Sequence, residues 1–293
     1  MLKTYAIAWF YYTFVSVKTI IMSLYDRIQA TAAFLKEKVK NLPEVGIILG
    51  SGLGEMANMV TVEVELTYSE ILNFPVSTVD GHIGKLIFGK LKGKNVMMMA
   101  GRFHYYEGYD MQQVTFPVRV MKALGVHTLI VSNAAGGMNT NFKIGDIMII
   151  NDHINLFPEH PLRGPNDERL GTRFPDMSAP YDKQLIAQAK QIANAHEIEL
   201  REGVYVGLSG PTFETKAEYK WLHIIGGDAV GMSTVPEVIV AVHDGLKVFA
   251  ASIITDLGVG DHIVPITHDE VLEAANFAAP RLAKIIMGLI QKM

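Results

Sequence analysis

Two short segments bring together residue types that suit a planar heterocyclic ligand. They are Gly-Pro-Thr-Phe-Glu-Thr at residues 210–215 and Asp-Ala-Val-Gly-Met-Ser-Thr-Val-Pro-Glu at residues 228–237. A flat heterocycle needs apolar contacts on its two faces and one anionic acceptor for a ring N–H. The segments supply such a set, together with a hydroxyl: Phe213, Glu214, Val230, Met232 and Ser233.

Glu214 has two interpretations when it is considered alone. A carboxylate surrounded by apolar side chains is costly unless it meets a polar partner, which favours a role in binding a ligand. An acid immediately before a helix predicted at residues 215–222 also stabilises the N-terminus of that helix, and such acids are common. The rest of the chain favours the first interpretation, because further loops of unusual composition follow other predicted strands.

One of these loops is Gly-Ser-Gly-Leu-Gly at residues 50–54, between a predicted strand and a predicted helix. Its glycines let the backbone approach a ligand, and its N–H groups can hold an anion. A tight structural turn explains the glycines equally well. The loop lacks both the Gly-Lys-Ser/Thr of a P-loop and the full Gly-x-Gly-x-x-Gly dinucleotide pattern.

Cationic and polar side chains add to this candidate anion site. Ser51 offers a hydroxyl, and Arg102 and His104 follow a later predicted strand. The planar guanidinium of arginine suits phosphate oxygens. His82, in Asp-Gly-His-Ile-Gly at residues 80–84, has a flexible backbone around it, although a purely structural role is the alternative. These residue types predict a phosphate pocket rather than a dinucleotide groove.

Predicted helices and strands, which must position these residues, alternate along the chain. Apolar residues at helical spacing alternate with short runs that are apolar throughout, which is typical of an α/β fold with a central mixed, largely parallel twisted sheet flanked by helices. Helices are predicted at residues 24–39, 114–124, 182–196, 217–225, 236–243 and 268–292. Strands are predicted at residues 45–49, 85–89, 96–100, 128–132, 146–150, 204–208 and 248–254.

The candidate functional loops all follow predicted strands. In open α/β sheets, ligands bind beyond the carboxyl ends of the strands, so we expect these loops to meet. They lie at residues 50–54, 101–106, 133–137, 210–214 and 255–258.

Composition excludes several classes of function. Hydrophobic residues make up 49% of the 293 residues and charged residues 19%, which allows a sizeable core. A net charge of −4 without a basic block argues against nucleic-acid binding. The absence of cysteine excludes thiol catalysis, and the ten histidines show no metal-binding spacing, so we expect neither a metal nor another cofactor. No linker divides the chain, which favours one domain over two.

Residues 1–21 differ from the remainder of the chain. They include an apolar, aromatic run that partly resembles a signal peptide or membrane anchor. Lys18 and polar residues interrupt the run, and no small-x-small cleavage site follows it. A second methionine, Met22, precedes an amphipathic helix. We therefore interpret residues 1–21 as an upstream extension of a cytoplasmic protein that does not bind membranes, and residues 22–293 as its domain.

From about Leu24 onward, the chain resembles the trimeric purine nucleoside phosphorylases. The matching segments run in the family's order over roughly nine-tenths of the chain, which makes a chance match implausible. They lie at residues 50–54, 81–84, 101–109, 132–139, 152–156, 161–169, 210–215 and 231–237.

The resemblance implies that the chain converts a purine nucleoside and inorganic phosphate to free purine and ribose 1-phosphate. It implies a phosphate site formed by Ser51, His82, Arg102, His104, the backbone of Ala134 and Ser233. It implies sugar contacts from Tyr106, Met232 and His268, and a base site lined by Phe213, Glu214, Val230 and Asp256. Phe174 matches an aromatic residue that family members lend to a neighbouring subunit, which implies a homotrimer.

The implied reaction is consistent with these groups. A phosphate dianion stabilises the oxocarbenium-like sugar. The departing purine needs a proton or strong hydrogen bonds. The candidate catalytic residues are Glu214, Asp256 and His104. The Glu214 carboxylate accepts from N1–H, which hypoxanthine and guanine carry and neutral adenine lacks. This carboxylate favours inosine and guanosine, without distinguishing between them.

Asp256 departs from the family pattern. Members specific for 6-oxopurines carry Thr-Asn where this chain has Thr255-Asp256. An ionised aspartate only accepts hydrogen bonds and favours the 6-amino group of adenine, as in the related methylthioadenosine phosphorylases. A protonated Asp256 can instead donate to N7 of a 6-oxopurine and act as general acid. We expect the protonated form, with adenosine or methylthioadenosine phosphorylase activity as the alternative.

Two other classes of protein fit the sequence less well. A nucleoside-binding protein without catalytic activity is disfavoured, because the matched polar positions other than Asp256 keep their expected chemistry. An NAD-dependent enzyme requires an acid about 20 residues after the glycine loop within a βαβ unit. Glu70 lies at that distance, but in a polar stretch to which no predicted strand leads.

Overall fold

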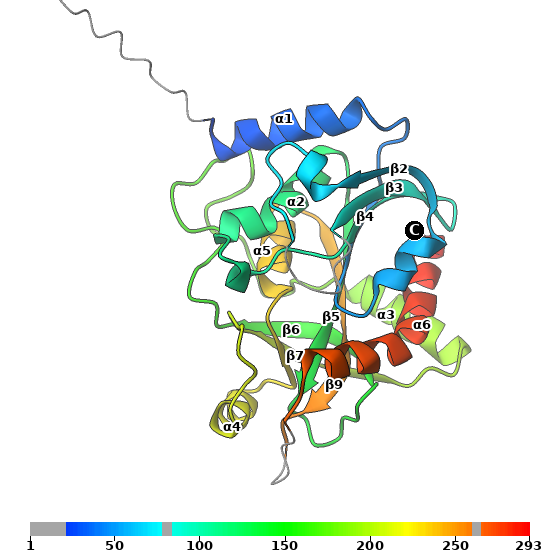
Figure 1. Ribbon diagram of the computed structural model, residues 1–293, viewed down its shortest axis with the longest axis vertical. Coiled ribbons are helices and arrows are strands. Elements are labelled where there is room, and N and C mark those ends of the chain that lie inside the picture. Colours follow the sequence, from blue (N-terminus) through cyan, green and yellow to red (C-terminus); the bar gives the residue numbers. More distant parts are fainter. Residues whose placement is uncertain (1–21, 78–83, 260–264) are drawn as a thin grey trace, which may run out of the picture.

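A computed structural model describes residues 22–77, 84–259 and 265–293 (Figure 1). In these residues nine strands form one mixed sheet with helices on both faces, which confirms the predicted α/β fold. The strands are β1 (Val45–Leu49), β2 (Thr61–Thr67), β3 (Lys85–Leu91), β4 (Lys94–Ala100), β5 (Thr128–Gly137), β6 (Ile147–Asn155), β7 (Leu200–Gly207), β8 (Ala229–Gly231) and β9 (Lys247–Leu257). The helices are α1 (Leu24–Lys36), α2 (Met111–Ala123), α3 (Lys183–Ala195), α4 (Lys216–Ile224), α5 (Val235–His243) and α6 (His268–Lys292), with 3₁₀ turns at Gly54–Met59, Tyr68–Glu70 and Tyr105–Glu107.

The sheet topology brings the ends of several strands to one edge. The strand order is β2-β3-β4-β1-β5-β8-β7-β6-β9, and an additional β5–β9 pairing closes the last five strands into a ring. β4, β1, β5 and β9 are successively paired in parallel. Their carboxyl ends therefore point the same way, as predicted for four of the five strands that precede functional loops. β7, which precedes the loop at residues 210–214, runs the other way, because it is parallel to β6 and β8 and these strands pair antiparallel with β9 and β5.

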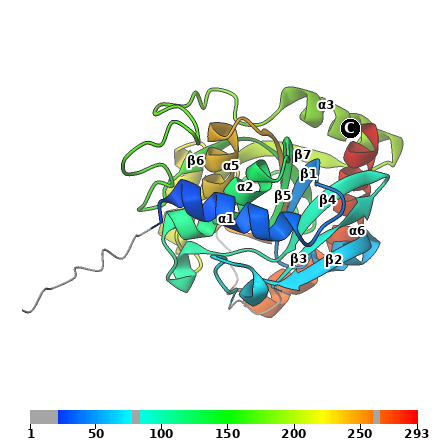
Figure 2. The ribbon, with the colours of Figure 1, turned by 90° about the horizontal axis from the view of Figure 1, so that it is seen from above.

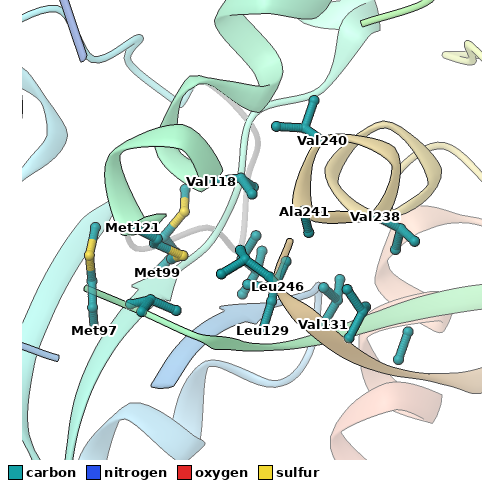
Figure 3. Packing of buried hydrophobic residues seen from close by; sticks show 14 of the residues in the cluster. Met97, Met99, Val118, Met121, Leu129, Val131, Val238, Val240, Ala241 and Leu246 are labelled. Atoms are coloured by element: carbon teal, nitrogen blue, oxygen red, sulfur yellow. The ribbon is translucent and has the colours of Figure 1, made fainter. Parts of the chain in front are cut away.

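Strand alternation builds a hydrophobic core on each face of the sheet. In β4, Met97 and Met99 belong to one core cluster and Met98 belongs to the other, because successive strand side chains point to opposite faces. The first cluster packs α1, α2 and α5 against the sheet, and Figure 3 shows Val118 and Met121 of α2 beside the two methionines. The second cluster buries one face each of α3 and α6.

Helix caps fix where the helices begin. Ser23, Asp182, Thr215 and Thr267 cap α1, α3, α4 and α6, and each accepts a hydrogen bond from a backbone N–H of the first turn. Figure 2 shows α3 beside the C-terminal part of α6, where the two helices share the second core. The cap at Thr215 starts α4 immediately after Glu214, so this acid precedes the helix instead of forming its first turn.

The structure corrects several element predictions. β2 and the three-residue β8 were not predicted, since β2 is largely exposed and β8 is too short to show a pattern. β2 leads to Glu70, contrary to the sequence analysis, but it pairs antiparallel with β3 and so forms no βαβ unit. Residues 133–137 and most of residues 255–258 are not loops, because β5 continues to Gly137 and β9 to Leu257.

Two features predicted from the sequence lie outside the described residues, namely the extension at residues 1–21 and His82. Among the residues that are described, no helix combines the length and the apolar character needed to cross a membrane. Within the same residues, no group of three or more histidine and acidic side chains has an arrangement that could hold a metal ion.

Candidate active site

All the predicted site residues except His82 and Phe174 meet in one cavity at the edge of the sheet where β1, β4, β5 and β9 end. β8 and the N-terminal parts of α4 and α6 complete its wall. The predicted residues that line the cavity are Ser51, Arg102, His104, Tyr106, Ala134, Phe213, Glu214, Val230, Met232, Ser233, Asp256 and His268.

Phe174 lies elsewhere. Its side chain is 85% exposed and does not line the cavity, and its ring lies 5.8 Å from the guanidinium carbon of Arg173. An exposed aromatic ring is available for contact with another molecule, as a role in a neighbouring subunit requires. That role stays a prediction.

Arg102 lies at the polar end of the cavity and is 1% exposed. Its Nη1 donates to Glu237 Oε1 and to Thr234 Oγ1, both at 3.2 Å, and its Nη2 donates to the carbonyl oxygen of Ser132. Glu237 is itself buried and compensates the guanidinium charge. A buried charge requires such a partner, because its desolvation is costly. These bonds hold the guanidinium in one orientation at the cavity wall.

Thr234 connects the groups around Arg102. Its Oγ1 is 2.8 Å from Asn133 Nδ2 and 3.1 Å from Ser233 Oγ. Its backbone has φ 71° and ψ −54°, and Val235 N donates to Ser233 O at 2.8 Å, which defines a γ-turn. This conformation is strained for a β-branched residue, and strain of this kind clusters at functional sites. The turn places the Ser233 hydroxyl at the cavity beside Arg102.

His104 is 7% exposed and is fixed by two neighbours. Its Nδ1 lies 3.1 Å from Glu107 Oε1, and its ring stacks on Tyr106 with centroids 4.7 Å apart. Burial lowers the pKa of His104, the nearby charge of Arg102 adds to this effect, and the hydrogen bond to Glu107 opposes it. In the neutral ring that donates from Nδ1 to Glu107, Nε2 is a hydrogen-bond acceptor.

Two carboxyl groups lie at the other end of the cavity. Burial raises the pKa of Asp256 and also that of Glu214, where the charge of Asp256 raises it further. Tyr219 Oη donates to Asp256 Oδ2 at 2.8 Å, and Thr255 Oγ1 donates to Asp256 Oδ1 at 3.0 Å. Both acids are half-buried, and two interacting acids in such a site titrate as a pair and tend to retain one proton between them.

Apolar side chains line the cavity near the two acids. Val230 is 1% exposed and Met232 is half-buried. Phe213, on the loop between β7 and α4, is 43% exposed. Together they leave an apolar slot next to two hydrogen-bonding acids. This arrangement is suited to an aromatic heterocycle with polar atoms on its edge.

Sequence reasoning missed four residues of the site. Thr234 and Glu237 lie within the segment at residues 228–237, but nothing in the pattern showed that they bind Arg102. Asn133 is the first residue of the predicted loop at residues 133–137, where only the backbone of Ala134 was assigned a role. Tyr219 gave no signal of function, because a tyrosine on the buried face of a helix is ordinarily a core residue.

Comparisons with known proteins agree with this geometry. Residues 44–291 match the model of the phosphorylase superfamily. The chain is 53% identical over 266 residues to purine nucleoside phosphorylase 1 of Geobacillus stearothermophilus, covering 91% of this chain and 97% of that protein.

Solved structures agree as well. The crystal structures of purine nucleoside phosphorylase from Schistosoma mansoni in complex with adenosine and with inosine both superpose with a TM-score of 0.86, at 43% and 42% identity. Each comparison covers 91% of this chain and 96% of the other. The chain belongs to the purine nucleoside phosphorylase family of the phosphorylase superfamily.

Proposed function

We propose that this protein catalyses the phosphorolysis of purine ribonucleosides and deoxyribonucleosides, and that it prefers inosine and guanosine. The products are the free purine and the pentose 1-phosphate. The observation that carries the proposal is that one cavity is lined both by a buried guanidinium and by two half-buried carboxyl groups whose pKa values burial raises. The similar enzyme from S. mansoni has been crystallised with inosine and with adenosine.

The polar end of the cavity is the proposed phosphate site. Arg102, the hydroxyls of Ser51 and Ser233, and the backbone N–H of Ala134 supply donors for the oxygens of a dianion, and neutral His104 accepts from a protonated phosphate oxygen. As the C1′–N9 bond lengthens, the sugar gains oxocarbenium character, and the bound phosphate stabilises this charge before it attacks C1′. Phosphate is both co-substrate and nucleophile, so the proposed reaction uses no cofactor.

The two acids are the proposed site for the edge of the base. Ionised Glu214 accepts the N1–H of a 6-oxopurine, and protonated Asp256 donates to N7 as the bond to the sugar breaks. Burial raises the pKa of both groups, which favours the retention of one proton by the pair. Phe213, Val230 and Met232 contact the base, and Tyr106 and His268 contact the sugar.

Substrate preference tests this assignment. Inosine, guanosine, adenosine and methylthioadenosine are assayed with phosphate, and we expect the two 6-oxopurine nucleosides to have the highest kcat/KM. Methylthioadenosine or adenosine phosphorylase activity is the second candidate, because an ionised Asp256 would accept from a 6-amino group. A wild-type protein that cleaves either 6-aminopurine nucleoside much faster than inosine would support the second candidate.

Asp256→Asn is expected to keep activity toward inosine and guanosine within about tenfold of wild type, because asparagine still donates one hydrogen bond. Activity toward adenosine is expected to fall further, since the variant loses the charge that attracts the 6-amino group. The wild-type rate on inosine should also fall as pH rises through the elevated pKa of Asp256, where the acid form disappears. This loss of activity at alkaline pH should be absent in Asp256→Asn. If the variant showed the same pH profile as the wild type, protonated Asp256 would not be the donor.

We also propose a homotrimer in which Phe174 covers the sugar site of a neighbouring subunit. Covering that site would exclude water from a reactive cation. Phe174→Ala is expected to raise the KM for inosine about tenfold or more, because the contact of a phenylalanine ring is lost. Phe277→Ala is the control, since Phe277 is 78% exposed and lies on α6. Light scattering should give three times the chain mass of 32.3 kDa, and a fully active monomer would refute the proposal.

A further inference from the structure

Tyr219 is a buried titratable residue of the cavity to which the proposed reaction assigns no role. It lies on α4 and is 3% exposed, and its hydroxyl donates to Asp256 Oδ2 at 2.8 Å. Glu214 lines the same cavity as Tyr219 and Asp256, and an interaction with the Tyr219 side chain lowers the pKa of its carboxyl group. The phenol is therefore hydrogen-bonded to one of the two acids of the proposed base site and interacts with the other.

The surrounding backbone makes room for this arrangement. Gly136 of β5 is paired with Asp256 of β9, and a Cβ at Gly136 would lie 2.8 Å from Tyr219 Oη and 3.0 Å from Asp256 Oδ2. A Cβ at Gly258 would lie 2.0 Å from the Tyr219 ring. Any larger residue at either position would displace the tyrosine. The close approach of phenol and carboxylate thus depends on two glycines at the ends of adjacent strands.

A phenol in this position can transfer a proton without changing the total charge. Its O–H donates to one carboxylate while its lone pair accepts the O–H of the other carboxylic acid. When the Glu214 proton moves to the phenol oxygen and the phenol proton moves to Asp256, two O–H bonds break and two form. The acid has then moved from Glu214 to Asp256, and the pair still carries one negative charge.

We propose that Tyr219 is a specificity-determining residue that passes a single proton between Glu214 and Asp256, so that the cavity accepts both 6-oxopurines and, more slowly, 6-aminopurines. This inference rests on the proposed phosphorolysis. With the proton on Asp256, Glu214 accepts from N1–H of a 6-oxopurine and Asp256 donates to N7. With the proton on Glu214, Glu214 donates to the N1 lone pair of adenine and Asp256 accepts from the 6-amino group.

The hydroxyl stabilises the ionised form of Asp256. It donates to Asp256 Oδ2 at 2.8 Å, and this hydrogen bond lowers the pKa of Asp256 against the opposing effect of burial. Removing the hydroxyl should therefore leave the proton mainly on Asp256, the state that suits 6-oxopurines.

Other charged groups around the pair are few. Glu218 of α4 raises the pKa of Glu214 slightly, and its carboxylate is held by the hydroxyl and backbone N–H of Thr215 at 2.7 Å. β5, which packs beside Asp256, contributes no titratable side chain between residues 128 and 137. Arg102, His104 and His268 line other parts of the same cavity.

Tyr219→Phe tests the proposal. We expect kcat/KM for adenosine to fall at least about tenfold, and kcat/KM for inosine to stay within about threefold of wild type, because one hydrogen bond to a charged group is lost. The alkaline limb of the inosine pH profile should move to higher pH, since the hydroxyl no longer stabilises ionised Asp256. In an Asp256→Asn background, Tyr219→Phe should leave the adenosine-to-inosine ratio unchanged, because the relay is already absent.

Tyr181→Phe is the matched control. Tyr181 is also a buried tyrosine, its hydroxyl lies 3.0 Å from His153 Nδ1, and it does not line the cavity, so the ratio should not change. Equal losses for adenosine and inosine in Tyr219→Phe, with an unmoved pH limb, would show a structural role only. Inosine cleavage without any adenosine cleavage by the wild type would also overturn the relay while leaving phosphorolysis intact. Inactivity toward every nucleoside would instead contradict the proposed function.

Discussion

Replacing Arg102 with methionine is expected to raise the KM for phosphate by roughly 10- to 150-fold, the cost of losing one hydrogen bond to a charged group. The affinity for the free purine should change little, because the base site lies at the other end of the cavity. Initial rates at varied phosphate concentration give the first quantity. Calorimetric titration with hypoxanthine gives the second.

The same substitution is expected to lower the free energy of unfolding by about 3–5 kcal/mol, because it leaves the buried Glu237 carboxylate without its cation. Combining Arg102→Met with Glu237→Gln removes that uncompensated charge and should restore most of the stability without restoring phosphate affinity. Comparing the single and the double variant thus separates the effect of Arg102 on phosphate affinity from its effect on stability.

Arg201→Met is the control for Arg102. Arg201 forms an ion pair with Asp146 at 2.8 Å and does not line the cavity, so its loss should leave the KM for phosphate unchanged. If purine affinity collapsed in Arg102→Met while phosphate dependence stayed normal, the assignment of this end of the cavity to phosphate would be wrong.

Replacing Glu214 with alanine is expected to lower kcat/KM for inosine on the order of 100-fold, since the N1–H of the base then loses a charged acceptor. Adenosine should lose less, because its N1 carries no proton and only accepts a neutral hydrogen bond from protonated Glu214, which contributes less than a bond to a charged group. Glu214→Gln should lie between alanine and wild type on inosine, as its amide oxygen remains an acceptor. The measurement is kcat/KM for both nucleosides in all three proteins.

Glu202→Ala is a suitable control for this series. Glu202 forms an exposed ion pair with Lys190 on the surface, and such pairs contribute about 0–1 kcal/mol to stability. Its loss should leave both substrates unaffected. If Glu214→Ala left kcat/KM for inosine unchanged, or lowered it less than that for adenosine, Glu214 would not be the charged acceptor for N1–H of the base.

The strands that carry the site could be predicted because their physical signature is local. β1 and residues 96–100 of β4 are apolar throughout, and the first half of β5 is mostly apolar, so a covered sheet follows from their composition, and polar residues after them mark its functional edge. β8 could not be predicted in this way. Three residues show no periodicity, and its antiparallel pairing with β5 depends on segments far apart in the chain.

The same distinction separates the predictable from the unpredictable site residues. Glu214 and Asp256 stand out in the sequence, because acids are unusual beside apolar strand ends. Their partner Tyr219 does not, since its function depends on a hydroxyl reaching across to another strand. Glu237 is similar: its ion pair with Arg102 joins residues 135 positions apart. Only the three-dimensional arrangement shows which polar side chains compensate each other.

The most direct test of phosphorolysis is product analysis with purified protein and inosine. With phosphate present, we expect equimolar hypoxanthine and ribose 1-phosphate, quantified by chromatography and by ³¹P NMR, and no appreciable product when phosphate is omitted. Release of hypoxanthine and free ribose at the same rate with and without phosphate would contradict the account.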